Sequence, residues 1–179
     1  GVLPAIIGYP LPFESFELVT KLPSDLEARI AILFSSLKSL EVNDILMRLR
    51  APKKVIKRCR HLHFLIDNTP AEHELRLYRM VVSKEVNTHI SLASATGKVT
   101  SLIEKSLQYP TDITCLVDGE WLMKKTKFEP GMKLGRLKDW LYRIQIERGY
   151  TSIAQMETAL CTIPWNEGDS SQWPKVQWP

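Results

Sequence analysis

The sequence predicts an all-α protein, a multi-helix array of short to medium helices in two subdomains. Apolar residues recur at helical spacing along most of the chain, as expected where one face of each helix is buried. Capping residues precede several of these segments, and proline or glycine separates them. No segment alternates polar and apolar residues over a length that would build a sheet.

Four regions are expected along the chain. They are an extended lead-in over residues 1–22, a helical body domain over 23–110, a helical tail domain over 111–163, and a Trp/Pro-rich extension over 164–179. Among the 179 residues, 44% are hydrophobic and 25% are charged, which is typical of a folded core rather than of disorder. The chain does not start with methionine, and its first residues resemble the middle of a longer polypeptide.

The first half of the chain predicts three helices after the lead-in. Prolines punctuate Pro4–Pro12, so this part is expected to be extended. The first helix is expected over 24–37, where a capping box precedes the apolar residues, and a shorter one over 42–49. The third is expected over 52–68, with proline at its first position and a strongly basic outer face.

The rest of the body predicts two more helices. One begins with a second capping box at Thr69 and extends to Val86, and a less regular one follows over 89–107. Tyr109–Asp112 ends that helix and is the expected boundary between body and tail.

The tail carries clear start and stop signals. Asp118 is expected to cap a short helix, and a long helix is expected over 131–148. Gly149 supplies the end of the long helix, and Ser152 begins a capped last helix that reaches Leu160.

Cysteine content and hydropathy exclude several classes of protein. The three cysteines are far apart and odd in number, which argues against a disulfide framework or a cysteine-rich zinc site. We therefore expect an intracellular, reducing compartment, either cytoplasmic or mitochondrial. No apolar run is long enough to span a bilayer and the start is no signal peptide, so no membrane partner is expected.

The basic residues gather in two clusters, although the net charge is only +4. The first has no acid between its members, which are Arg48, Arg50, Lys53, Lys54, Lys57, Arg58 and Arg60. The second consists of Lys124, Lys125, Lys127, Lys133, Arg136, Lys138 and Arg143. Two such clusters on an otherwise balanced chain indicate a polyanion partner. The alternative for the first cluster is an ordinary solvated helix face.

The start of the long tail helix has the features of an anion site. Pro130 pre-sets the backbone there, and Gly131 and Gly135 leave the first turns bare. Uncapped N–H groups and the positive end of the macrodipole attract anions at such a start. The nearby cations make phosphate the expected anion, and they are Lys133, Arg136 and Lys138. The alternative is that the two glycines serve close helix packing.

Other chemistry is not predicted. His61 and His63 lie two positions apart on different helix faces, so they cannot form a helical metal pair, and no metal site is expected. All four histidines are expected to be surface or packing residues. Serine, histidine and aspartate are scattered without a nucleophile motif, which argues against a hydrolase triad.

The order of motifs over Val117–Leu160 resembles the C-terminal tail of the tRNA nucleotidyltransferases, the CCA-adding enzymes, and of the related bacterial poly(A) polymerases. In that family a short turn precedes a Pro-Gly-x-x-x-Gly segment like the one at Pro130, and a helix and a Gly-x-x-Ser break like the one at Gly149 follow. Asp25–Ile66 resembles the middle region of the same enzymes, because Arg48–Lys57 is similar to the family's Arg-Leu-Arg-Leu-Ser-Asn-Lys-x-Ile run.

This sequence also departs from the family. Many members end the first body helix in a His-Asp pair, where this chain has Ser35 and Ser36, which excludes a metal-phosphohydrolase helix here. The Gly-Ser and Asp-x-Asp motifs of the catalytic head are absent from this sequence, so no catalytic residue is predicted and whether the protein acts as an enzyme stays open. Mg²⁺, CTP and ATP would belong to that missing head, and no cofactor is expected in this chain.

The resemblance implies a region that binds tRNA or another structured RNA by shape and phosphate contacts, and thus a role in tRNA processing. The residues implied to contact RNA are Arg48, Arg50, Lys53, Lys54, Lys57, Lys133, Arg136 and Lys138. The alternative is a non-catalytic structural subunit of a larger ribonucleoprotein, for instance in an organelle, derived from the same family. In that case the Trp/Pro-rich extension is expected to dock onto a protein neighbour.

Overall fold

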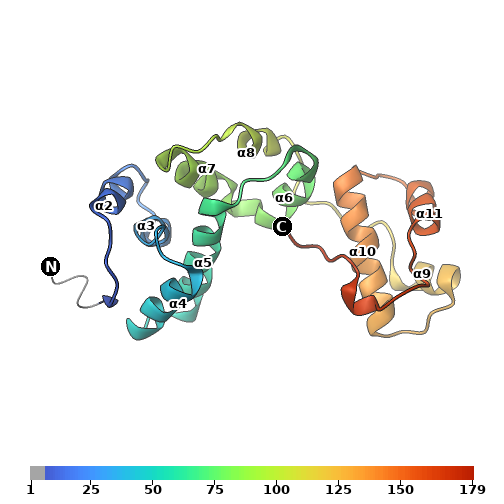
Figure 1. Ribbon diagram of the computed structural model, residues 1–179. Coiled ribbons are helices and arrows are strands. Elements are labelled where there is room, and N and C mark those ends of the chain that lie inside the picture. The colour runs from blue at the N-terminus through green and yellow to red at the C-terminus, as the bar shows by residue number, and fades with distance from the viewer. Residues whose placement is uncertain (1–6) are drawn as a thin grey trace. The chain divides into compact units, whose positions relative to one another are not determined.

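The computed structural model describes residues 7–179, which form helices and turns and contain no strand (Figure 1). The all-α prediction is confirmed. The chain divides into two compact units. Unit 1 comprises the described residues up to Thr69 together with Lys84–Glu104, and unit 2 comprises Pro70–Ser83 together with Lys105–Pro179.

Unit 1 is organised around its longest helix, α5 (Lys53–Asp67). Three further helices of this unit pack against α5, namely α3 (Leu26–Leu33), α4 (Ser39–Arg48) and α7 (Val86–Ala95), and α2 (Phe13–Thr20) packs on α3. Part of the core lies between α4 and α5, where Val42, Ile45 and Cys59 are completely buried. The short 3-10 turn η2 (Ser83–Glu85) precedes α7, and α8 (Ser101–Ser106) follows it; the boundary between the two units falls within η2 and again within α8.

Unit 2 is organised around α10 (Met132–Arg148). The helices that pack against it are α6 (Leu75–Val82), α9 (Gly119–Thr126) and α11 (Ile153–Thr162), with the 3-10 turns η1 (Glu72–Glu74) before α6 and η3 (Ser170–Gln172) near the end of the chain. Figure 1 shows α9 and α11 on one side of α10. Leu122, Leu137 and Leu141 form the fully buried centre of this packing.

The helix signals of the tail are found where the sequence predicts them. The Asp118 carboxylate accepts a hydrogen bond from the Trp121 N–H at 2.8 Å. Ser152 and Gln155 form a reciprocal capping box at the start of α11. Gly149 follows α10 with a φ of 65°. Local polar chemistry therefore determines these three helix ends.

Two expected capping boxes of the body are wrong in detail. Asp25, not Ser24, caps α3, because its carboxylate accepts from the Ala28 N–H at 3.0 Å. At the second site the Glu74 carboxylate accepts from the Ala71 N–H at 2.9 Å, so the cap lies two residues beyond Thr69.

The lead-in and the domain boundary also differ from expectation. Residues 1–22 were expected to be extended, but Phe13–Thr20 forms α2, because no proline occurs between Pro12 and Pro23 and Glu14 is favourable in a first helical turn. α6 belongs to unit 2, although it lies within the expected body, because it packs on α10. Residues 1–6 lie outside the described residues.

The Trp/Pro-rich extension packs on its own unit. The Trp173 ring lies 5.6 Å from the Trp140 ring between centroids, and Trp178 meets Tyr78 edge-on at 4.8 Å. The Trp178 Nε1 also donates to the Glu74 carboxylate at 3.3 Å. Trp173 and Trp178 are therefore buried within unit 2 and do not form exposed docking anchors.

Candidate functional site

A tight turn connects α4 to α5 in the first basic cluster. The Ala51 N–H donates to the Leu46 carbonyl at 2.9 Å, and the Arg50 N–H donates to the Met47 carbonyl at 3.0 Å. This pair of bonds is a Schellman motif, in which one residue adopts the left-handed conformation and glycine is the usual choice. Arg50 holds that position, with a φ of 54°.

The same motif ends two other helices, and both use glycine. Gly97 follows α7 with a φ of 71°, and Gly149 follows α10 with a φ of 65°. A side chain in this conformation costs roughly 1 kcal/mol relative to glycine. Arg50 is therefore an unfavourable choice for the turn itself, and it is an exposed residue.

Basic residues also occupy the start of α5. Pro52 precedes the helix and offers no side-chain cap, and no acidic residue lies in the first turn. Lys53 and Lys54 stand there instead, beside the positive end of the macrodipole. Each like-charge placement of this kind costs about 0.3–1 kcal/mol, whereas a bound anion would be stabilised by the same N–H groups and lysines.

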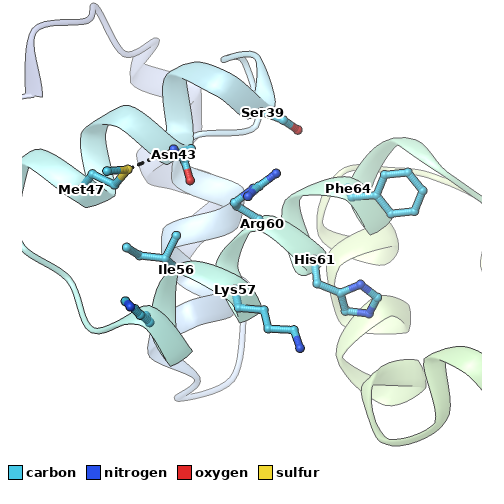
Figure 2. A pocket seen from close by; sticks show the side chains of 9 residues that line it. Ser39, Asn43, Met47, Ile56, Lys57, Arg60, His61 and Phe64 are labelled. Atoms are coloured by element: carbon cyan, nitrogen blue, oxygen red, sulfur yellow. Dashed lines mark hydrogen bonds between the residues drawn. The ribbon is translucent and has the colours of Figure 1, made fainter.

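A groove with a volume of about 590 Å³ lies along the seam of α4 and α5 (Figure 2). Three residues of α4 and six of α5 line it, and they are Ser39, Asn43, Met47, Lys53, Ile56, Lys57, Arg60, His61 and Phe64. No aspartate or glutamate from the described part of the chain is among them. The groove therefore combines apolar walls with a purely cationic set of charged groups.

Five cations beside the groove have no acidic partner in the part of the chain that the structure describes. Within residues 7–179, no ion pair involves Arg50, Lys53, Lys54, Lys57 or Arg60. All five side chains are exposed. We call these five residues the basic surface of unit 1. Their charge is thus available to an external anion.

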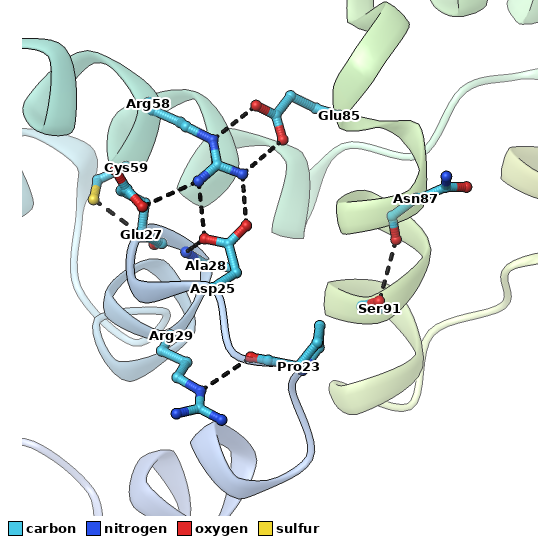
Figure 3. A network of polar contacts seen from close by, with 10 residues as sticks. All are labelled: Pro23, Asp25, Glu27, Ala28, Arg29, Arg58, Cys59, Glu85, Asn87 and Ser91. Carbon is cyan, nitrogen blue, oxygen red and sulfur yellow. Dashed lines mark hydrogen bonds and ion pairs between the residues drawn. The ribbon is translucent and has the colours of Figure 1, made fainter.

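Arg58 belongs to the same run in the sequence but points into unit 1 (Figure 3). Its guanidinium pairs with Asp25 at 2.6 Å, with Glu27 at 3.1 Å and with Glu85 at 2.8 Å. Hydrogen bonds from Arg58 hold the pKa of the Asp25 and Glu85 carboxyls below their usual values, and these bonds raise the pKa of Arg58 further. Arg58 is therefore a structural cation.

Arg48 also has a structural role, although it is an exposed residue. Its Nη1 donates to the Ile7 carbonyl at 3.2 Å. The guanidinium lies so close to Gly8 that a Cβ there would fall 2.7 Å from Nη1. Gly8 itself has a φ of 78°. Of the five body residues expected to contact RNA, Arg48 is thus tied to the start of the chain, whereas the other four belong to the basic surface.

The three expected tail cations lie on α10. The Lys133 ammonium sits 4.3 Å from the centre of the Phe128 ring and 5.8 Å from that of Trp173, so it makes cation–π contacts with both. Arg136 and Lys138 are half-buried and form no ion pair within residues 7–179. Lys133 therefore packs on the aromatic cluster, and Arg136 and Lys138 keep unpaired charge.

The two glycines beside these cations are not required for packing. Apart from the adjacent backbone, a Cβ added at Gly131 or Gly135 would meet no atom within 4 Å in the part of the chain that the structure describes. The interpretation that these glycines serve close helix packing is therefore wrong. Bare backbone remains at the start of α10, whose N-terminus has no side-chain cap.

The histidines occupy separate environments. His63 is buried and its Nε2 lies 3.1 Å from the Phe34 carbonyl, whereas His61 lines the groove. His89 is buried, and desolvation lowers its pKa to about 4. Among residues 7–179, no three metal-binding side chains come together.

Of the residues that line the groove, the sequence singled out Lys53 and Lys57 as contacts, and those it missed include Arg60 and His61. Arg60 and His61 follow Lys57 by three and four positions, so they share its helix face. This helical spacing from Lys57 is present in the sequence and could have indicated both residues. It distinguishes Arg60 from Arg58, however, only when the buried face of α5 is known.

The chain was compared with protein-family models, with characterised proteins and with solved structures, and none of the three comparisons found a match. No helix in the described part of the chain is long and apolar enough to cross a membrane.

Proposed function

We propose that this chain is an RNA-binding helical region, similar to the body and tail of tRNA nucleotidyltransferases, that grips tRNA or another structured RNA through phosphate contacts. The observation that supports it best is the basic surface of unit 1. Its exposed cations have no acidic partners among the described residues. Phosphate contacts of this kind fix the position of a protein on a nucleic acid without reading its sequence.

The competing interpretation is a solvated helix face. Such a face is normally interspersed with acids and keeps lysine away from helix N-termini. Here Lys53 and Lys54 stand at the N-terminus of α5, and Arg50 occupies a glycine position. Together these three residues lower the local stability of the turn and of the start of α5. Binding of an anion would offset that loss of stability.

The tail contributes a second, smaller set of contacts in this proposal. Arg136 and Lys138 form no ion pair with any described residue, and the bare backbone at Gly131 and Gly135 leaves room for a sugar-phosphate chain. Lys133 is already engaged with Phe128, so its contribution to RNA affinity is expected to be smaller. The proposal applies equally to a region of an enzyme and to a ribonucleoprotein subunit, because both need the same grip.

The test is the salt dependence of binding to a tRNA transcript, measured by fluorescence anisotropy. The observed affinity should fall with a log–log slope of about −0.7 to −0.9 per phosphate neutralised. Lys53→Gln and Lys57→Gln should each weaken binding and reduce the slope by about 1. Lys21→Gln, an exposed lysine of unit 1 outside the basic surface, is the matched control.

Two results would contradict the proposal. One is binding to tRNA that does not change with ionic strength. The other is an effect of Lys21→Gln equal to that of Lys53→Gln and Lys57→Gln, because net charge rather than this surface would then explain the affinity.

A further inference from the structure

We propose that the groove between α4 and α5 holds an unpaired nucleobase of the bound RNA, with the flanking phosphates on the cations at its edge. This inference rests on the proposed function and specifies the class of RNA that the site prefers. It follows from the composition of the groove, which is apolar on its walls and cationic on its rim.

The apolar part of the groove presents surface to solvent. The apolar residue Met47 is 60% exposed, and it lines the groove from α4. Ile56 lines the opposite wall from α5 and is half-buried. Flat aromatic bases pack well on such surfaces, and methionine adapts to their shape because it is unbranched and polarisable.

The charged part of the groove forms a row along α5. Lys53, Lys57 and Arg60 lie at positions i, i+4 and i+7, so they share one face of the helix. With a rise of about 1.5 Å per residue, the row extends over roughly 10 Å. A nucleic-acid strand that follows the groove would therefore meet successive cations with its phosphates.

Polar groups lie beside the apolar wall. Asn43 and Ser39 line the groove from α4, and the Asn43 amide donates to the Met47 sulfur at 3.3 Å. His61 lies on α5, and burial lowers its pKa, which favours the neutral imidazole. A neutral imidazole and an amide are groups that can hydrogen-bond or stack with a base.

The size and charge of the groove argue for an unpaired base rather than a duplex. Its volume of about 590 Å³ lies within the range of sites for small organic ligands. A paired base is stacked and cannot enter such a groove, whereas bases in bulges, loops and ends are available. An acidic peptide would satisfy the cations but would leave the apolar wall at Met47 and Ile56 without a flat partner.

The experiment compares two RNAs that differ in one nucleotide. One is a fully paired RNA duplex, and the other is the same duplex with a single bulged 2-aminopurine. Wild-type protein should bind the bulged RNA about tenfold more tightly, because stacking of one base typically contributes this much to affinity. The 2-aminopurine emission should change on binding as the base enters the groove.

Two exposed residues of α4 provide a test variant and its matched control. Met47→Ser should remove most of the preference for the bulged RNA and leave duplex binding unchanged. Leu40→Ser, at a residue that is 76% exposed and does not line the groove, should leave both affinities unchanged. Both positions are exposed, and circular dichroism should show the same helix content in the three proteins.

The outcomes separate this inference from the proposed function. Equal affinity for the two RNAs, or equal effects of Met47→Ser and Leu40→Ser, would overturn the base-binding groove while salt-dependent duplex binding would still support the RNA grip. Binding to neither RNA would overturn both. Displacement of the bulged RNA by polyglutamate at comparable charge concentration would assign the groove to acidic peptides and overturn the inference.

Discussion

Arg58 and Asp25 form a two-pronged ion pair, in which Nη1 donates to Oδ1 at 2.8 Å and Nη2 donates to Oδ2 at 2.6 Å. The same Asp25 carboxylate caps α3, and the same guanidinium also binds Glu85 at the start of α7. One side chain of α5 therefore holds two neighbouring helices of unit 1 in place. Every N–H donor of the planar guanidinium takes part in these contacts.

Arg58→Ala should lower the free energy of unfolding by roughly 2–3 kcal/mol, because three carboxylates would remain together without a cation. Arg58→Lys should recover only part of this, since an ammonium cannot bind two carboxylates in the same geometry. Urea unfolding monitored by circular dichroism provides the measurement. Arg60→Ala is the matched control on the same helix, and it should change stability by less than about 0.5 kcal/mol while weakening RNA binding. Equal stability losses for the two variants would contradict the assignment.

Arg50→Gly should separate stability from binding. The substitution removes the strain of a side chain in the left-handed conformation and should stabilise the protein by up to about 1 kcal/mol. It also removes one cation of the basic surface, so affinity for tRNA should fall. Thermal unfolding and a tRNA titration of the same preparation measure the two effects. A variant that loses stability would show that the Arg50 side chain has a structural role.

Gly135→Ala should stabilise α10, because the added Cβ meets open space and alanine is favoured over glycine inside a helix by about 1 kcal/mol. If RNA approaches the bare backbone there, affinity should decrease despite the gain in stability. Melting temperature and tRNA affinity are the readouts. Gly97→Ala is a useful contrast, since its φ of 71° should make the same change destabilising. Unchanged RNA affinity in Gly135→Ala would remove the start of α10 from the proposed interface.

His89 should make unit 1 less stable in mild acid. Burial lowers its folded pKa to about 4, whereas an unfolded histidine titrates near 6.5. The unfolded state therefore binds the extra proton between these values. The contribution of neutral His89 to the free energy of unfolding is therefore fully present above about pH 6.5. It is lost as the pH falls toward 4, by roughly 3 kcal/mol at most.

Urea unfolding at several pH values between 4.5 and 7.5 measures this effect. His89→Gln should flatten the profile, and His73→Gln, which changes an exposed imidazole, should not. Asp25 and Glu85 add a separate loss below about pH 4.5, because their folded pKa values are lowered and protonation of their carboxylates opposes folding. An unchanged profile in His89→Gln would assign the acid sensitivity to other groups.

Helix identity could be predicted from the sequence where local chemistry decides it. Asp118 and Ser152 cap α9 and α11 as expected, because a cap depends on residues within one turn. The assignment of α6 to unit 2 could not be predicted, because periodicity identifies a buried face but not the core that covers it. The same limit applies to Trp178, whose partner Tyr78 lies far away in the sequence.

The candidate site was predicted only in part. The run without acids pointed to Lys53, Lys54 and Lys57, which are exposed as expected. Composition alone could not distinguish Arg58, which is neutralised by residues distant in sequence, from Arg60, which lines the groove. Such a distinction needs the direction of each side chain, and that depends on tertiary packing.

Because α6 belongs to unit 2, the two units cannot be expressed separately as continuous segments of the chain. Pro70–Ser83 folds with the end of the chain, and Lys84–Glu104 folds with its beginning. Any single internal cut in the gene therefore breaks at least one unit. Expression of residues 105–179 alone would leave α10 without its neighbour α6, so the apolar surface between them would face water. The two units are not modules that can be exchanged end to end.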